Sequence, residues 1–178
     1  MNFLVKAFWV LKTKISFGLY RNIGRLSYIA NPIFILGRSR MVVGNKVRIF
    51  PGARIEVMEG AELLIEDNVS IGPNVNITVA RRVLIGAGTT ISANVFITDM
   101  DHDIKVENTS VMDTPNIVSS GTNIGRYCFI GTGAVILAGA CLDDNVVVGA
   151  NSVVKGCLKM SSIYAGSPAR FLKNRYDI

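Results

Sequence analysis

Residues 124–154 read IGRYCFIGTGAVILAGACLDDNVVVGANSVV, and every sixth residue of this segment is aliphatic. The same spacing occurs in three earlier groups of three, which are separated by insertions. Fifteen positions follow it, eleven of them isoleucine: Val43, Ile49, Ile55, Ile65, Ile71, Ile77, Ile85, Ile91, Ile97, Ile124, Ile130, Ile136, Leu142, Val148 and Val154. A period of six fits neither the 3.6-residue period of a helix nor the alternation of an ordinary strand, so the repeat itself points to the fold.

The six-residue unit has the composition expected of one side of a coiled parallel β-solenoid. β-Branched residues suit short strands, and the glycines that directly follow six of the fifteen positions suit tight corners. Three units close one triangular turn, and successive turns stack at roughly 4.8 Å. The sequence therefore predicts an all-β fold, a parallel β-helix of about five triangular coils.

The insertions into the repeat all follow the third unit of a turn, so they should leave the solenoid at the same corner. The longest, residues 98–123, is rich in Asp, Asn, Ser and Thr and contains His102, the only histidine of the chain. Long polar excursions from a rigid repeat commonly carry function. We expect a protruding loop here, with His102 as its candidate functional residue.

The repeat divides the chain into a basic, apolar N-terminal segment (1–40), the β-helix with its loop (41–160) and a C-terminal tail (161–178). Residues 2–20 show a helical stripe of Leu4, Phe8, Leu11, Ile15 and Leu19. Two interpretations stay open for this helix. It could cap the open end of the solenoid, or it could lie on an anionic membrane surface.

Composition excludes several classes of protein. Residues 1–55 carry ten Lys or Arg and no acid, whereas the remainder is net acidic and has no recognised nucleic-acid motif, so we expect no nucleic-acid partner. Three cysteines without a Cys-x-x-Cys pair favour a reducing compartment, the cytoplasm. One histidine and three cysteines cannot build a metal site of several His or Cys ligands, so no metal is expected.

The chain resembles the hexapeptide-repeat acyltransferases over residues 40–173. The most specific segments are Ile124–Ile136 and Val148–Val154, followed by Ala165-Gly166-Ser167-Pro168-Ala169-Arg170, while residues 93–102 (ANVFITDMDH) look like the branch that O-acetylates sugars of bacterial polysaccharides. The resemblance implies a left-handed β-helix, acetyl-CoA as acyl donor, a sugar or oligosaccharide acceptor and a homotrimer with active sites between subunits. In such an enzyme, residues 2–20 could make a peripheral contact with the inner membrane.

The resemblance also implies roles for individual residues. The family's general base is a histidine at the start of the protruding loop, which falls on His102. Removal of the hydroxyl proton makes the acceptor oxygen a competent nucleophile toward the thioester. Asn74, Asp99 and Asp101 are expected to contact the substrate. Which of Asp99, Asp101, Asp103 or a backbone carbonyl orients the imidazole stays open. The expected coenzyme A contacts are the pantetheine groove (Gly131, Thr132, Gly149 and Ala150) and the phosphate side (Lys155, Arg170 and Lys173).

Two departures from the family pattern affect this reading. Lys155-Gly156 stands where relatives often have Thr-Lys, and Lys159-Met160 stands where some have a Pro-Pro turn. The main alternative is N-acetylation of a nucleotide-linked amino sugar, and a non-catalytic β-solenoid is a further one. A zinc enzyme of the carbonic-anhydrase type shares the fold but needs three histidines, so it is excluded.

Overall fold

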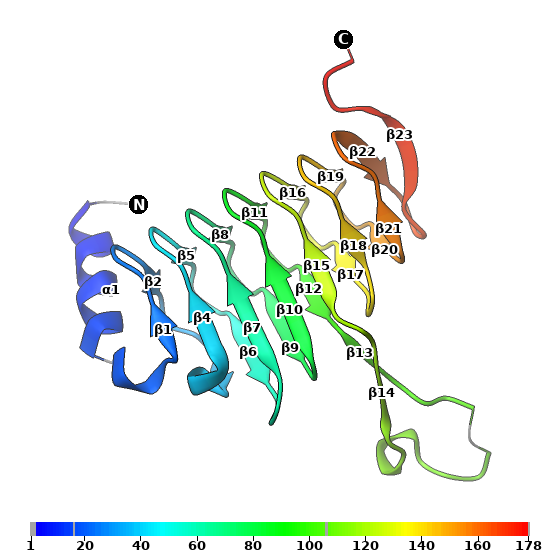
Figure 1. Ribbon diagram of the computed structural model, residues 1–178, viewed down its shortest axis with the longest axis horizontal. Helices are drawn as coiled ribbons and strands as arrows, with labels where there is room; N and C mark the ends of the chain where they lie inside the picture. Colours follow the sequence, from blue (N-terminus) through cyan, green and yellow to red (C-terminus); the bar gives the residue numbers. More distant parts are fainter. Residues whose placement is uncertain (1–2, 16, 106, 178) are drawn as a thin grey trace.

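The solenoid is built from three parallel sheets that form the sides of a prism (Figure 1). The computed structural model describes residues 3–15, 17–105 and 107–177. The first sheet contains β1 (Asn22–Ile23), β4 (Met41–Val43), β7 (Glu62–Ile65), β10 (Arg82–Ile85), β15 (Thr122–Ile124), β18 (Cys141–Leu142) and β21 (Cys157–Leu158). The second contains β2 (Tyr28–Ile29), β5 (Arg48–Ile49), β8 (Ser70–Ile71), β11 (Thr90–Ile91), β16 (Phe129–Ile130), β19 (Val147–Val148) and β22 (Ser162–Ala165). The third contains β3 (Phe34–Leu36), β6 (Arg54–Val57), β9 (Asn76–Val79), β12 (Phe96–Thr98), β17 (Val135–Ile136) and β20 (Val153–Val154).

The aliphatic repeat fills the interior of the prism. All fifteen predicted positions are at most 2% exposed, and they stack in register from turn to turn, as in Ile71 on Ile91 and Ile91 on Ile130. Each position thus buries its side chain against its own equivalents above and below. The all-β, left-handed β-helix is confirmed.

The β-helix has about seven turns, so the prediction of about five was too low. Strands β1 to β3 make a turn before the first predicted one, with Ile23 and Ile29 in the core. Strands β21 and β22 add to the other end, where Leu158 is buried. The prediction started the repeat at Val43, although Ile23, Ile29 and Ile35 already lie six residues apart. The 3₁₀ helix η2 (Arg38–Arg40) fills the step to the next turn.

The corners of the prism need residues that tolerate a left-handed backbone, and asparagine supplies most of those that are not glycine. Asn74, Asn94 and Asn151 have φ of 57°, 59° and 54° at equivalent corners between the second and third sheets. Glycine permits close stacking nearby, because a Cβ atom on Gly131 would lie 2.5 Å from the Ala150 nitrogen. Side chains could not pass at that distance.

The N-terminal end is covered by α1 (Phe3–Ile15), followed by η1 (Phe17–Leu19). Trp9 and Thr13 are the buried residues of this helix (8% and 5% exposed), and the Thr13 hydroxyl accepts a hydrogen bond from the Ile29 amide at 3.0 Å. The helix therefore caps the solenoid through a narrow face. No helix of the described ranges is long and apolar enough to span a membrane.

The C-terminal end is closed differently. Strand β23 (Arg170–Asn174) folds back antiparallel on β22, and the Phe171 ring meets the Tyr164 ring edge-on at 5.8 Å. Hydrogen bonds continue the ladder past the last turn, which covers the open end of the core without a helix (Figure 1).

The predicted loop is an arm that projects from the prism (Figure 1). We use "the arm" for residues 99–121, between β12 and β15. Its base is an antiparallel pair, β13 (Met100–His102) with β14 (Asn116–Val118), and its tip carries the 3₁₀ helix η3 (Val111–Asp113). The pairing fixes the first residues of the arm relative to the solenoid.

Candidate active site

His102 occupies the last position of β13, opposite Asn116 in β14. Its side chain is half-buried, and the Nδ1 atom is enclosed with no hydrogen-bond partner among the described residues. Asp101 does not orient the imidazole, since its Oδ1 accepts a hydrogen bond from the His102 backbone amide at 2.8 Å. No described residue therefore fixes the imidazole through Nδ1.

Asp99 is enclosed by the protein and is not open to solvent. Its side chain is fully buried, and its carboxylate accepts hydrogen bonds from the amides of Ala80 (2.7 Å), Arg81 (2.8 Å) and Arg82 (2.5 Å). These bonds tie the base of the arm to the corner before β10. Both oxygens are thereby occupied, so Asp99 is better explained as an anchor for the arm than as the expected substrate ligand.

The other expected substrate ligands differ in accessibility. Asp101 is exposed beside His102 on the arm. Asn74 is exposed at the corner that precedes β9, where its side-chain oxygen fills the space above Gly52 of the preceding turn. Asn74 therefore has a structural role at this corner as well as access to solvent.

The residues expected to hold pantetheine lie at the same kind of corner as Asn74. Gly131 and Thr132 follow β16, and Gly149 and Ala150 follow the paired strand β19. The Asn151 amide donates to the Thr132 carbonyl at 2.8 Å, which places the two corners directly against each other. Thr132 and Ala150 are exposed there. The structure thus brings these four residues together along one edge of the prism, which we call the acyl-donor edge after its predicted role.

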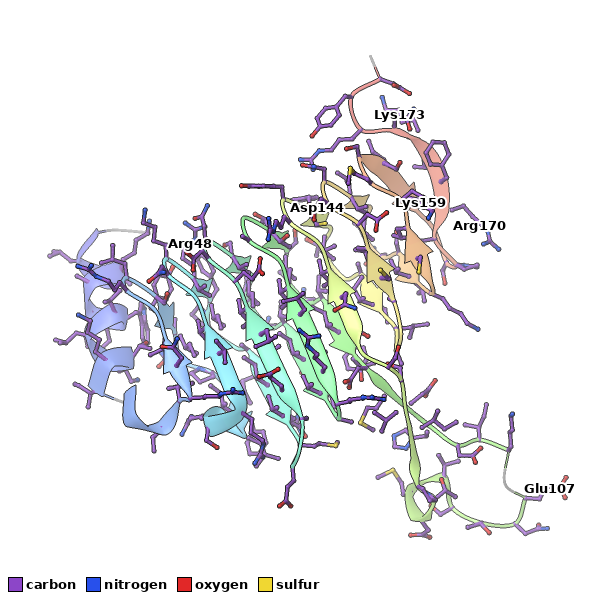
Figure 2. The ribbon with its side chains drawn as sticks, viewed as in Figure 1. Arg48, Glu107, Asp144, Lys159, Arg170 and Lys173 are labelled. Atoms are coloured by element: carbon purple, nitrogen blue, oxygen red, sulfur yellow. The ribbon has the colours of Figure 1, made fainter. Side chains whose placement is uncertain are left out.

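The three cations expected at the coenzyme A phosphates lie at separate positions. Arg170 pairs with Ala165, whose Cβ would be 2.8 Å from a Cβ on Gly149, so Arg170 lies near the acyl-donor edge. Lys173 lies further along β23 and donates to the Asp177 carbonyl at 3.3 Å (Figure 2). Lys155 follows β20, at the next corner of the prism.

His102 and the acyl-donor edge occupy opposite ends of the strands of the third sheet. The edge precedes these strands, whereas the arm leaves from the end of β12. Four residue steps from Asn94 to Thr98 span about 13 Å in extended conformation. Within a single chain, the candidate base and the candidate donor groove therefore lie apart.

A groove with an apolar strip on the first sheet was not predicted; we call it the apolar groove. Val42, Leu64 and Leu84 point outward from adjacent strands in direct register and line a depression of about 510 Å³, which Glu66, Asp67 and Arg126 also line. Its sequence signal is a pair of aliphatic residues where the other strands of the first sheet have Asn or Cys before the inward residue: Val42-Val43, Leu64-Ile65 and Leu84-Ile85. Each inward residue is in the core, so the outward partner is left half-exposed on the surface.

The buried thiol of Cys128 is not activated, and the described residues hold no metal cluster. Burial raises the pKa of Cys128 to about 11, which keeps this thiol protonated near neutral pH. No group of three or more His, Cys, Asp or Glu side chains able to hold a metal lies within the described ranges.

Comparison with known proteins agrees with this geometry. Residues 121–156 match the family model for the bacterial transferase hexapeptide (six repeats). WbbJ of Escherichia coli K12, named as an O-acetyl transferase of lipopolysaccharide biosynthesis, is 31% identical over 171 residues, which cover 92% of this chain and 84% of WbbJ. The chain belongs to the hexapeptide-repeat transferase family. WcaF of the same organism, named as an acetyltransferase of colanic acid biosynthesis, is 26% identical, covering 81% of this chain and 75% of WcaF.

Two solved structures share the fold. The N-acyltransferase AntD of Bacillus cereus, in complex with dTDP and coenzyme A, superposes with a TM-score of 0.77 at 18% identity, covering 92% of this chain and 89% of AntD. The Vibrio cholerae hexapeptide-repeat acetyltransferase VCA0836, in complex with acetyl coenzyme A, gives a TM-score of 0.62 at 21% identity, covering 94% and 78%.

Proposed function

We propose that this protein is an acetyl-CoA-dependent O-acetyltransferase that transfers an acetyl group to a sugar hydroxyl in polysaccharide biosynthesis. The observation that carries the proposal is His102, the only histidine of the chain, half-exposed at the root of a polar arm on a hexapeptide-repeat frame. The names of WbbJ and WcaF support the reaction and its setting.

The reaction follows from the chemistry of an imidazole beside a thioester. His102 takes the hydroxyl proton while the sugar oxygen attacks the thioester carbonyl carbon. The tetrahedral intermediate then collapses, the carbon–sulfur bond breaks, and the imidazolium returns the proton to the departing thiolate. The products are the O-acetylated sugar and free coenzyme A. Asp101, exposed next to His102, is the substrate ligand that we keep from the arm.

The donor would lie on the acyl-donor edge. Small residues at Gly131, Gly149 and Ala150 leave room for an extended pantetheine arm, and exposed backbone groups there can hydrogen-bond to its amides. Arg170, near Gly149, is the cation best placed for a phosphate, and Lys155 and Lys173 are further candidates.

The active form would be a homotrimer in which the arm of one subunit reaches the acyl-donor edge of the next. Two observations support this assembly: the separation of His102 from that edge within one chain, and the apolar groove of Val42, Leu64 and Leu84. Leu64→Asp should yield monomers in analytical ultracentrifugation and abolish transfer. A folded, fully active monomer would contradict the shared site.

Complementation tests the shared site directly. His102→Ala disables only the arm, and Ala150→Trp blocks only the edge. Co-expression of these two inactive chains should restore part of the activity, because some interfaces then combine an intact arm with an intact edge. Activity that never returns in mixed trimers would place both parts in one chain.

N-acylation is the second candidate, because AntD shares the fold and is an N-acyltransferase. An amine acceptor that arrives protonated also needs a base, so His102 serves either reaction. The acceptor therefore has to be identified by assay.

The deciding experiment measures free coenzyme A thiol released from acetyl-CoA with a panel of hexoses, nucleotide sugars, amino sugars and polyprenyl-linked oligosaccharides. We expect release that depends on a hydroxyl acceptor and disappears in His102→Ala. Release only with amino sugars would establish the second candidate. Failure to bind acetyl-CoA would leave a non-catalytic solenoid.

We also propose a cytoplasmic location with a peripheral membrane contact through residues 2–20. The apolar stripe of α1 supports it, because this stripe faces away from the solenoid: Phe8 is 57% and Ile15 81% exposed. Lipid-linked sugars would then be within reach of the enzyme.

A further inference from the structure

A cavity of about 460 Å³ lies between α1 and the start of the second sheet. Lys6 and Lys14 of α1 line it on one side, and Lys46 and Arg48, at the start of β5, line it on the other. Figure 2 shows Arg48 at the α1 end of the prism. Apolar side chains and Tyr28 complete the lining, so four cations surround a largely apolar floor.

None of these four cations forms an ion pair within the described part of the chain, although Lys46 is close enough to Asp67 to help lower the pKa of that carboxyl. No Asp or Glu lines the cavity, and the chain contains none before Glu56. The three ion pairs found in the described part of the chain involve Arg21, Arg54 and Arg126, which lie outside the cavity. The Arg48 guanidinium donates to Asn68, to its carbonyl at 3.2 Å and its side-chain oxygen at 3.1 Å. A dense cluster of cations that form no ion pair favours an anionic ligand.

Tyr28 supplies a second, independent indication of a ligand. Its side chain is 2% exposed, and its buried hydroxyl has no hydrogen-bond partner among the residues described. Burial raises the pKa of Tyr28, while nearby Arg48 opposes that shift, so the hydroxyl stays protonated and can donate. A buried donor without an acceptor costs stability, and an anionic oxygen in the cavity would satisfy it.

The surroundings of the cavity distinguish a lipid from a soluble anion. Leu11 lines the cavity and is 61% exposed, and it continues the outward stripe formed by Leu4, Phe8 and Ile15. A soluble phosphate would leave this stripe in water. A phospholipid would place its headgroup among the cations while the acyl region covers the stripe, as in helices that lie in a membrane interface.

We propose that this cavity binds the phosphate of an anionic membrane phospholipid, held by Lys6, Lys14, Lys46 and Arg48 and by the Tyr28 hydroxyl. The inference deepens the membrane contact proposed above, and it does not depend on acetyl transfer. It specifies which end of the solenoid meets the membrane and through which polar groups.

The test is co-sedimentation with phosphatidylcholine vesicles, with and without phosphatidylglycerol. We expect binding that requires phosphatidylglycerol. It should weaken roughly 10–30-fold in the double variant Lys46→Gln, Arg48→Gln, because two headgroup contacts are lost. The control Arg81→Gln, Lys159→Gln removes the same charge from exposed positions outside the cavity and should change binding little.

Tyr28→Phe removes one hydroxyl without changing charge, and we expect it to weaken binding about 3- to 10-fold. Unchanged binding in both Tyr28→Phe and the cavity double variant, with binding lost in Phe8→Asn, would overturn the cavity proposal and leave the membrane contact intact. Failure of the wild type to bind any vesicle would overturn both.

Inorganic phosphate separates the two possible anion sources. We expect millimolar phosphate to leave vesicle binding nearly unchanged. Full competition by phosphate, or equal weakening by the control double variant, would contradict a lipid site. Transfer to a soluble acceptor is measured on the same proteins. We expect it to persist in the cavity variants, so a failed acetyltransferase assignment is recognised separately.

Discussion

Two segments leave the regular solenoid, and they differ in what they expose. The arm presents polar residues and the only histidine, whereas α1 presents an apolar stripe flanked by lysines. Each segment is attached to the solenoid through a buried polar side chain: Asp99 of the arm accepts three backbone hydrogen bonds, and Thr13 of α1 accepts one. The frame between them is uniform, so catalysis and membrane contact should be separable by mutation.

The largest expected effect comes from the arm. His102→Ala should lower kcat by roughly 10²–10⁴-fold with little change in acetyl-CoA affinity, because it removes a general base and leaves the donor groove intact. Steady-state kinetics and acetyl-CoA titration measure the two quantities. Vesicle binding of the same variant serves as the control and should match the wild type. Unaltered turnover would remove His102 from the mechanism.

The next largest effect is expected at Asp99, where the arm is attached to the solenoid. Asp99→Ala leaves three backbone amides without their acceptor, and we expect the free energy of unfolding to fall by about 3–5 kcal/mol. Urea unfolding measures it. Asp113→Ala, an exposed aspartate of the same arm, should stay within about 0.5 kcal/mol of wild type. Equal small effects of the two substitutions would mean that Asp99 does not anchor the arm.

The difference between the regular solenoid and the two segments that leave it also explains which features the sequence could predict. The core follows from a six-residue period, because each inward position repeats the same environment. The sequence predicts a substrate contact for Asp99, because the amides at 80–82 that bind its carboxylate become neighbours only when turns stack. The stripe on α1 was correctly located, but its outward direction depends on Trp9 and Thr13 meeting β2. Contacts between turns and between elements leave no pattern in the local sequence from which they could be predicted.

The root of α1 should give a smaller effect than the root of the arm. Thr13→Val removes the acceptor of one buried amide, that of Ile29, at similar side-chain volume, and we expect a loss of about 1–3 kcal/mol. Hydrogen exchange of the α1 amides should rise while transfer to a soluble acceptor persists. Thr109→Val, on the exposed tip of the arm, is the matched control. Equal loss of acetyl transfer would show that the two segments are coupled.

The smallest predicted effect on stability comes from the solenoid, at the thiol of Cys128. The pKa of this thiol is raised from 9.0 to about 11, chiefly by burial, so the folded protein holds its proton at pH values where the unfolded chain has lost it. Stability should therefore fall as the pH rises from about 9 toward 11, by about 1 kcal/mol between pH 8 and pH 10. Urea unfolding of wild type and Cys128→Ala across this range isolates the contribution, because all other groups titrate in both proteins. The two pH profiles should diverge above pH 9, and parallel profiles would show that the interior admits water beside β16, contrary to a closed frame between the arm and α1.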